Sequence, residues 1–323
     1  MLSVVFIVRD EADRLPGALA SLGRVPDVVV CDTGSVDGTL DVAALAGARL
    51  TEARWTGDFA AARTAAQLHA RYPWILRMDA DERLMVGPGL PSDWLGATLR
   101  RAERADADLI YVRRRYSPTN QHWFPRIFRA DRFRWAKPLH EALVPVGERR
   151  RVIAAGGAVF VHAPSARPRA YADLALHHLA RAPGDPHLLY FRARSLWEEG
   201  RLAESVPALR TYLAGPTDYR FHRGEAHRML GAALDAIGDH PEALRHLDEA
   251  ARGDGDRAEA AVDRVRLHLA RGERAEARRW IGWAAAASPP RERAPWGGWT
   301  RPYLLETTAW SEQTWRLAGR RAA

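Results

Sequence analysis

The sequence predicts an α/β domain with a Rossmann-like, mostly parallel sheet at residues 1–165 and an all-helical repeat domain at residues 170–323. Short apolar runs in the first half alternate with helical segments of about 10–15 residues, which is typical of a parallel sheet with right-handed crossovers. Several of these runs end in carboxylates. A glycine-centred repeat occupies the second half, which is alanine-rich and helical in pattern.

Buried strands are expected where apolar residues run without interruption. The expected strands are 3–8, 27–31, 49–55, 74–78, 109–116 and 158–162. Helical spacing predicts helices at 11–22, 58–71 and 92–104, with Ser92 as the N-cap of the last. The order of these segments favours successive strand–helix–strand units.

Carboxylates follow three of the expected strands. Asp10 follows the first strand, Asp32 the second, and Asp79 and Asp81 the fourth. Ligands of open parallel sheets bind beyond the carboxyl ends of the strands. Two hard oxygen donors at this spacing suit Mg²⁺ or Mn²⁺, which complete their shells with substrate phosphates. The pattern therefore predicts a nucleotide with its metal, although an acidic turn is the alternative.

Phosphate-binding glycine loops are missing from the sequence. It contains no Gly-X-Gly-X-X-Gly segment and no Gly-X₄-Gly-Lys-Ser/Thr segment. Dinucleotide-binding and P-loop proteins are therefore disfavoured, and a site built from carboxylates indicates metal-bridged phosphates.

Composition and charge set broader limits. With 323 residues, 47% hydrophobic and 27% charged, the chain is expected to be globular, with about two domains. The first apolar run is too short and is followed too soon by charged residues to be a signal peptide. No apolar run approaches the roughly 18 residues of a membrane span, so a cytoplasmic protein is expected. The net charge of +8 favours anionic partners, but no base-stacking motif supports nucleic acid. The single Cys31 excludes an internal disulfide.

Three segments carry a family resemblance. They are Asp32-Thr-Gly-Ser-Val-Asp37-Gly-Thr, Trp55-Thr-Gly-Asp58-Phe59-Ala-Ala-Ala-Arg63 and Met78-Asp79-Ala80-Asp81-Glu82. In this order and spacing they resemble the family 2 glycosyltransferases of the GT-A fold. The sequence resembles in particular the compact bacterial members that carry tetratricopeptide repeats after the catalytic domain. The resemblance extends over about the first 165 residues.

The resemblance implies a set of residues that contact the nucleotide. These are Arg9, Glu11, Asp32, Asp37, Arg63, Asp79 and Arg126. Within it, Asp32 holds the nucleobase or ribose, and Arg63 lies beside the nucleotide. Asp79 lies toward the ribose, and Arg126 is placed on the pyrophosphate or acceptor side. For Arg63, a solvated helix arginine is the alternative.

A His-Glu pair is the second chemical feature. The resemblance places His140 and Glu141 beside the sugar and acceptor. Family 2 transfer inverts the anomeric centre, and such a displacement needs a base for the acceptor proton. Glu141 is the expected base, and His140 would orient it or bind the donor. Glu82 and Asp81 are the rival candidates for the base. The alternative for Glu141 is a structural role as the partner of an arginine.

The resemblance also implies a divalent metal site. Asp81 binds the metal, together with Asp79, and His162 at the end of a strand fits a late histidine ligand. Such a ligand set with phosphate oxygens suits Mn²⁺ or Mg²⁺. For His162, a surface or capping role is the alternative.

The second half contains an internal repeat. Segments beginning at Gly200, Gly238 and Gly272 align with offsets of 38 and 34 residues, and 34 is the tetratricopeptide period. Each glycine would allow the tight turn between antiparallel helices. Stacked helix pairs bind peptides or form homodimers. A final helix is expected at about 304–320.

The leading hypothesis is an inverting, metal-dependent glycosyltransferase. It would move a sugar from a nucleotide donor, expected to be UDP-linked, to an acceptor held by the repeats, such as a peptide or protein side chain. One alternative acceptor is a cell-envelope glycan or a small molecule. A second alternative is a non-catalytic repeat scaffold with a degenerate nucleotide domain. A nucleotidyltransferase is disfavoured because a glycine-rich activating loop is missing.

Overall fold

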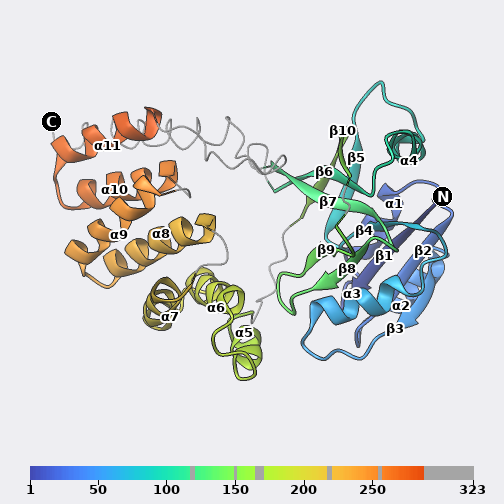
Figure 1. Ribbon diagram of the computed structural model, residues 1–323, viewed down its shortest axis with the longest axis horizontal. Helices are drawn as coiled ribbons and strands as arrows, with labels where there is room; N and C mark the ends of the chain where they lie inside the picture. Colours follow the sequence, from blue (N-terminus) through green and yellow to red (C-terminus); the bar gives the residue numbers. More distant parts are fainter. Residues whose placement is uncertain (117–120, 149–150, 164–170, 217–219, 254–256, 287–323) are drawn as a thin grey trace. The chain divides into compact units, whose positions relative to one another are not determined.

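The computed structural model describes residues 1–116, 121–148, 151–163, 171–216, 220–253 and 257–286. The chain divides into two compact units, Met1–Arg167 and Pro168–Ala323 (Figure 1). The first unit is built around a sheet, and the second is helical. This arrangement confirms the fold class predicted from the sequence.

An eight-stranded sheet forms the centre of the first unit, in the order β3-β2-β1-β4-β7-β6-β10-β5. Its strands are β1 (Leu2–Val8), β2 (Asp27–Asp32), β3 (Arg49–Glu52), β4 (Trp74–Arg77), β5 (Glu82–Val86), β6 (Leu109–Arg115), β7 (Gln121–Arg129) and β10 (Val152–His162). The first four in this order are parallel, as are β6 and β10. β7 and β5 run antiparallel to their neighbours. β8 (Phe133–Ala136) and β9 (Ala142–Pro145) form a separate antiparallel pair.

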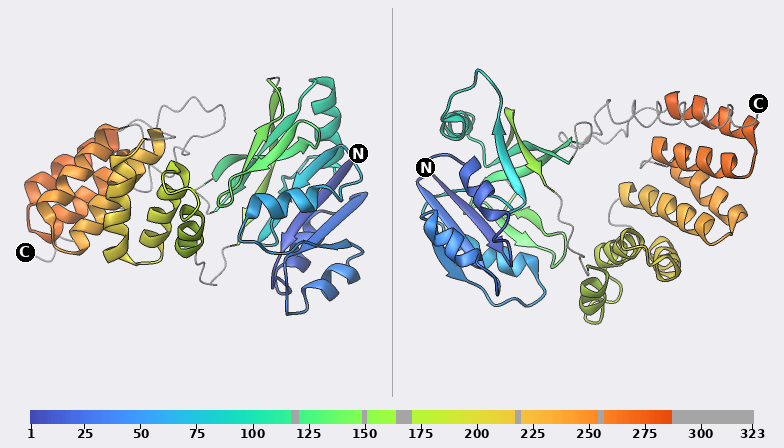
Figure 2. Two further views of the ribbon diagram at one scale, coloured as in Figure 1. Left: turned by 60° about the horizontal axis from the view of Figure 1, so that its bottom comes forward. Right: turned by 180° about the vertical axis from the view of Figure 1, so that it is seen from behind.

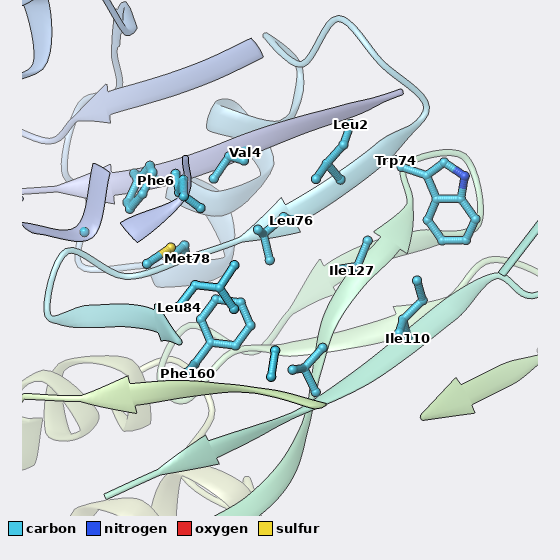
Figure 3. Packing of buried hydrophobic residues seen from close by; sticks show 14 of the residues in the cluster. Leu2, Val4, Phe6, Trp74, Leu76, Met78, Leu84, Ile110, Ile127 and Phe160 are labelled. Atoms are coloured by element: carbon cyan, nitrogen blue, oxygen red, sulfur yellow. The ribbon is translucent and has the colours of Figure 1, made fainter. Parts of the chain in front are cut away.

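Apolar side chains fill both faces of the sheet because successive residues of a strand point to opposite sides. Val4 and Phe6 of β1 belong to one core cluster, which also contains residues of α1 (Leu15–Ser21), α2 (Thr39–Leu45) and α4 (Trp94–Arg104). Val5 belongs to the opposite cluster, with residues of α3 (Phe59–Gln67) and β8. Figure 3 shows Met78 and Phe160 gathered on the first of these faces. The buried strands expected from the apolar runs are therefore sandwiched between two layers.

Several element boundaries differ from the sequence prediction. α4 begins at Trp94, and its N-cap is Asp93, whose carboxylate accepts from the Gly96 N–H at 3.0 Å, so Ser92 is not the cap. α1 begins at Leu15, because Arg14 is its N-cap and Pro16 occupies the first turn. β5 was not expected at all. This strand forms because side chains after Asp81 alternate between buried and more exposed positions, as in a half-buried strand.

β10 contains a bulge that changes its inward-facing positions. Its pairing with β6 jumps from Ala155 opposite Val112 to Val159 opposite Arg113. Ala155 before the bulge and Phe160 after it both face the same core cluster. Strict alternation would not allow this for residues five apart. Gly157 within the bulge has φ +85°, which favours glycine.

The described part of the helical unit contains three helix pairs, preceded by one further helix. Its described helices are α5 (Tyr171–Leu179), α6 (Pro186–Glu198), α7 (Leu202–Ala214), α8 (Arg220–Ala236), α9 (His240–Arg252), α10 (Arg257–Ala270) and α11 (Arg274–Ala286). Figure 2 shows these helices stacked beside one another in both views. Gly200, Gly238 and Gly272 occupy the turns within the pairs α6–α7, α8–α9 and α10–α11, with φ of +74°, +91° and +73°. The repeat read from the glycines is confirmed as three helical hairpins.

Close packing between α8 and α9 depends on a glycine. A Cβ atom placed on Gly231 would lie 2.7 Å from Cγ of Leu247 and 3.0 Å from the carbonyl oxygen of Ala243. Real Cβ atoms essentially never lie within 3.0 Å of another heavy atom in this way, so a side chain here would require α8 or α9 to shift. The corresponding position of the α6–α7 hairpin holds Ala193, which is fully buried.

Two further expectations concern membrane-spanning helices and the C-terminal helix. None of the helices in the described residues combines the length and apolarity that crossing a membrane requires. The helix expected at about 304–320 lies outside the described residues.

Candidate nucleotide and metal site

The centre of the site is the turn after β4. In the strand order, β2 and β3 lie on one side of β1 and β4 lies on the other, so the carboxyl ends of β1 and β4 mark the point where the connections change direction. Such points are where ligands bind in open α/β sheets. The N–H of Glu82 donates to the carbonyl of Asp79 at 3.1 Å, and the N–H of Asp79 donates to Oε2 of Glu82 at 3.1 Å. These bonds hold Asp79, Ala80 and Asp81 at this end of the sheet.

Asp81 and His162 lie side by side. Oδ1 of Asp81 is 3.4 Å from Nδ1 of His162, and each side chain is 10% exposed. The two residues are brought together because β10 pairs with β5, with His162 opposite Glu82. The N–H of Ala163 also donates to the carbonyl of Asp81 at 2.8 Å. The structure therefore joins the second carboxylate of the Asp-X-Asp segment to the late histidine.

This pair suits part of a divalent cation shell. The described residues contain no group of three or more His, Cys, Asp or Glu side chains that could hold a metal by themselves. Mg²⁺ is commonly bound through one or two carboxylates together with substrate phosphates and water. One carboxylate and one imidazole fit a site of that kind, which a diphosphate would complete. Arg114 also reaches this position, with Nη2 3.2 Å from Nδ1 of His162.

Asp79 is bound by arginines. Its Oδ1 accepts from Nη2 of Arg63, and its Oδ2 accepts from Nη2 of Arg77 at 2.8 Å. Arg114 lies 3.9 Å from the same Oδ2. Burial opposes ionisation of this carboxylate, but Arg77, Arg63 and Arg114 hold the pKa of Asp79 well below its usual value. Asp79 therefore stays ionised with both oxygens in ion pairs, whereas Asp81 faces the histidine.

Glu141 shares these arginines. Its Oε1 lies 3.1 Å from Nε of Arg63 and 3.9 Å from Nη2 of Arg77, and its side chain is 11% exposed. Both arginines lie over the ring of Trp135, at 5.8 and 5.9 Å from its centroid. We call Arg63, Asp79, Arg77 and Glu141 the four-residue ion cluster. It is electrically neutral and mostly buried.

His140 precedes this cluster and is exposed. Its φ is +49°, in the left-handed region that few residues other than glycine adopt. The segment before it is tied to α3, because the N–H of Phe59 donates to the carbonyl of Pro138 at 2.8 Å. This bond and the Arg63–Glu141 contact together bring the His-Glu segment to the start of α3, which the chain order alone did not show.

The predicted role of Arg126 on the pyrophosphate or acceptor side has to be corrected. Its side chain is completely buried, and Nη1 donates to Oε2 of Glu82 at 2.9 Å. Arg114 lies against the same glutamate, with Nε 2.8 Å from Oε1. The ring of Phe160 is 4.9 Å from the guanidinium carbon of Arg126. A wholly buried guanidinium does not reach a pyrophosphate or an acceptor, so Arg126 supports the site through Glu82.

The acidic residues near the first two strands hold two loops together. Asp32 is buried and accepts from the N–H of Gly34 at 2.9 Å. Oδ1 of Asp10 accepts from the N–H of Val36 at 2.8 Å, and Oδ2 of Asp37 accepts from the N–H of Ala12 at 3.2 Å. These acids link the segment after β1 to the segment after β2.

The two other residues predicted for the nucleotide pocket lie on the segment after β1. Arg9 is exposed, and Glu11 pairs with Arg14 at 2.8 Å.

Three residues of the site were not singled out from the sequence: Arg77, Arg114 and Trp135. Arg77 is a charge inside an otherwise apolar strand, which is a detectable signal. For Arg114, alternation along β6 predicts that its neighbours Arg113 and Arg115 point away from it. Arg113 is indeed exposed, with its guanidinium 5.0 Å from the ring of Trp123. Trp135 gave no signal, because it lies on a short strand outside the main sheet.

The α/β unit is a mostly parallel sheet with carboxylates, arginines and a histidine gathered at the carboxyl ends of its strands, where ligands of open α/β sheets bind. Residues 3–167, just over half of the chain, match the family model of glycosyl transferase family 2. The chain belongs to this family.

Similar proteins cover only part of the chain. A TPR repeat-containing protein of Synechococcus elongatus is 38% identical over 146 residues, which are 43% of this chain and 34% of that protein. An uncharacterized glycosyltransferase of Rickettsia bellii is 33% identical over 84 residues, which are 26% of this chain and 28% of that protein. The chain thus spans about a third or less of the length of these curated relatives. Among solved structures, S. aureus TarS aligns over 85% of this chain and 53% of that chain, with 14% identity and a TM-score of 0.38.

Proposed function

We propose that the α/β unit is an inverting, metal-dependent glycosyltransferase that moves a sugar from a nucleotide donor, a UDP-sugar, to an acceptor. The observation that carries the proposal is the contact between Asp81 and His162, 3.4 Å apart at the carboxyl end of β4. Membership of glycosyltransferase family 2 supports the same chemistry. The resemblance of the sequence to family 2 glycosyltransferases favours uridine diphosphate as the nucleotide.

The donor would bind over the carboxyl ends of β1, β2 and β4. We assign Asp32 to the nucleobase or ribose, with Arg9, Glu11 and Asp37 on the loops around it. Arg63 is 5% exposed, and among the described residues its Nη1 has no hydrogen-bond partner. Buried donors are normally satisfied, so Nη1 is available to an oxygen of the donor. Asp79 would contact the ribose or the metal while keeping its arginines.

Asp81 and His162 would hold Mn²⁺ or Mg²⁺ together with oxygens of the diphosphate. When bound, the ion supplies positive charge that stabilises the nucleoside diphosphate as it leaves. Arg114 adds a fixed positive charge 3.2 Å from His162. The chain itself therefore contributes both the ligands and a cationic neighbour on the leaving-group side.

Glu141 is the proposed base, and His140 would orient it or bind the donor. In a single displacement, a lone pair of the acceptor attacks the anomeric carbon, and the bond from that carbon to the diphosphate oxygen breaks. The acceptor proton passes to Glu141, and the electron pair of the broken bond leaves with the nucleoside diphosphate. Both ion pairs of Glu141 involve Oε1, which leaves Oε2 outside them for the proton.

The helical unit would bind the acceptor. Stacked helical hairpins present extended surfaces that commonly hold peptides, so we assign the acceptor to a peptide or protein side chain. A relative over 43% of this chain is named as TPR repeat-containing, which supports the presence of such repeats. A glycan or small-molecule acceptor and a homodimer through the repeats are outcomes that the acceptor experiment below would reveal.

The test is release of nucleoside diphosphate. The purified chain is incubated with Mn²⁺ and a panel of UDP-glucose, UDP-galactose, UDP-N-acetylglucosamine and GDP-mannose, with water as the acceptor. Turnover of one donor, lost in Asp81→Ala, is expected. Absence of both turnover and UDP binding would instead support a non-catalytic scaffold. Adding peptide and glycan libraries with the active donor, followed by mass spectrometry, then identifies the acceptor class, and the oligomeric state is measured by light scattering.

A further inference from the structure

The four-residue ion cluster links two parts of the proposed reaction centre. Asp79 belongs to the turn after β4, and Glu141 belongs to the segment before β9. Arg63, on α3, contacts both carboxylates with neighbouring nitrogens of one guanidinium. Nη2 donates to Oδ1 of Asp79, and Nε donates to Oε1 of Glu141 at 3.1 Å.

The guanidinium of Arg63 has little freedom to move. Its side chain is 6% exposed, and it lies over the ring of Trp135 with 5.8 Å between the guanidinium carbon and the ring centroid. Asp58 caps the N-terminus of α3 by accepting from the N–H of Ala61 at 2.9 Å, which fixes the helix that carries Arg63. A planar, preorganised fork of this kind can hold two carboxylates in a defined relation, whereas an ammonium group cannot.

Arg77 provides an internal comparison. It lies over the same ring, at 5.9 Å, and it donates to the same Asp79 at 2.8 Å. Its distance to Oε1 of Glu141 is 3.9 Å, too long for a hydrogen bond. The two arginines thus have similar charge, burial and neighbours. They differ in that Arg63 donates a hydrogen bond to Glu141, whereas Arg77 makes only the longer ion-pair contact.

We propose that Arg63 is a positioning residue that holds the Glu141 carboxylate in place and ties it to Asp79, an inference that rests on the proposed function. By engaging Oε1, Arg63 fixes the direction of Oε2, the oxygen that receives the acceptor proton. Its effect on the proton-transfer step passes through Glu141, whereas a contact of Nη1 with the donor changes donor affinity and not kcat at saturating donor. Arg77 donates its hydrogen bond to Asp79 and has only a longer ion-pair contact with Glu141, so its effect on that step depends less on Glu141.

A double-mutant cycle tests this assignment. The turnover number kcat for UDP release to water is measured at saturating donor for wild type, Arg63→Gln, Arg77→Gln, Glu141→Gln and the two doubles with Glu141→Gln. Loss of a general base slows a reaction by about 10²–10⁴-fold, so Glu141→Gln is expected to fall in that range. Arg63→Gln is expected to slow kcat at least tenfold alone but less than about threefold in the Glu141→Gln background, because coupled residues are not additive. Arg77→Gln, which removes only the longer contact with Glu141, is expected to change its effect on kcat between the two backgrounds by less than Arg63→Gln does.

The controls separate positioning from folding and charge. Thermal unfolding and calorimetric binding of UDP with Mn²⁺ are recorded for every variant. Arg63→Lys retains the charge without the fork and is expected to stay slow. If Arg63→Gln does not fold, the same cycle is run with Arg63→Lys.

Each result bears on a different claim. An equal Arg63 effect in both backgrounds, or full activity of Arg63→Lys, overturns the positioning role. Unchanged turnover in Glu141→Gln removes the base and this inference with it. A wild type that neither binds UDP with Mn²⁺ nor releases nucleoside diphosphate from any donor refutes the proposed function itself, a result distinct from a failure of the coupling in an active wild type.

Discussion

Arg126 and Glu82 form an ion pair in which neither side chain has any exposed surface, with Nη1 of the arginine 2.9 Å from Oε2 of the glutamate. Glu82 is the residue after Asp81 and also accepts from the N–H of Asp79. The pair therefore fixes the turn that presents the two aspartates. Burial lowers the pKa of Arg126, and the charge of Glu82 opposes that change.

Removing the arginine should destabilise the α/β unit. Arg126→Met leaves the Glu82 carboxylate buried with Arg114 as its remaining cation, and breaking a buried pair in this way costs about 3–5 kcal/mol. Urea denaturation should show this loss. The matched control is Arg129→Met on the same strand, whose side chain is 36% exposed and lies 3.3 Å from Asp131. That surface pair should contribute less than about 1 kcal/mol. Equal losses in the two variants would contradict a special role for the buried pair.

Metal binding should depend on Asp81 and His162. In the presence of UDP, Asp81→Asn and His162→Asn should each weaken Mn²⁺ binding by about tenfold or more, because removing a ligand costs at least as much as removing its outer-shell support. Electron paramagnetic resonance of Mn²⁺ measures this directly. Asp41→Asn, an exposed carboxylate on α2, is the control and should bind as wild type does. Chelation with EDTA should abolish turnover and added Mn²⁺ should restore it. Turnover that survives chelation would exclude a metal-dependent reaction.

A histidine pair should make the helical unit sensitive to acid. Nδ1 of His227 on α8 lies 2.9 Å from Nδ1 of His246 on α9. Burial, the neighbouring His246 and Arg223 lower the pKa of His227 to about 4. Burial, Arg245 and Arg210 lower the pKa of His246 as well, although Glu242, 3.6 Å from its Nε2, opposes this. Both histidines are therefore neutral in the folded unit near neutral pH.

The sign of the pH effect follows from these lowered pKa values. Below about pH 6.5 the unfolded chain binds protons that the folded pair does not, so stability falls as the pH drops from about 6.5 toward 4. For this half-buried pair, the free energy of unfolding should fall by about 1 kcal/mol between pH 7 and pH 5, after allowing for solvent screening. Thermal unfolding at a series of pH values measures it. His227→Gln should flatten the dependence in this window, and an unchanged slope would assign the effect to other groups.

Gly231 should be intolerant of a side chain. Gly231→Ala places a methyl group 2.7 Å from Cγ of Leu247 and 3.0 Å from the backbone of Ala243, and overpacking of this kind costs about 1–3 kcal/mol. Gly282→Ala on α11 is the matched control, because nothing lies within 4 Å of its added Cβ. That change should stabilise its helix by about 0.5–1 kcal/mol. Calorimetric unfolding of the two variants should show opposite signs. Stabilisation by Gly231→Ala would show that α8 and α9 separate easily.

The strand ends of the site were predictable from local patterns. Asp32, Asp79 and Asp81 follow apolar runs whose length and composition indicate buried strands, and the structure places each at the end of a strand. The glycine turns of the helical hairpins were likewise predictable, because a fixed spacing reports a repeated turn. Such features depend on neighbouring residues in the chain, so a single sequence contains enough information.

The arginine partners were not predictable from the same sequence. Arg63 and Glu141 are 78 positions apart, and their contact depends on how α3 meets the segment before β9. For Arg126, the family resemblance predicts a place on the pyrophosphate or acceptor side. Its burial depends on β10 and on Glu82, which only the strand order reveals. With 48 Lys and Arg residues in the chain, composition offers no way to choose among so many cations.

The bulge in β10 determines which side of the sheet the end of that strand addresses. Ala155 and Phe160 face one core only because the bulge between them shifts the alternation of the strand. His162 is two residues beyond Phe160 and therefore points to the same face as Phe160. Loss of one glycine from Gly156-Gly157 would leave the histidine in the chain and turn it to the opposite face. The distance between Asp81 and His162 is thus controlled by a local irregularity in the backbone as much as by the identity of either residue.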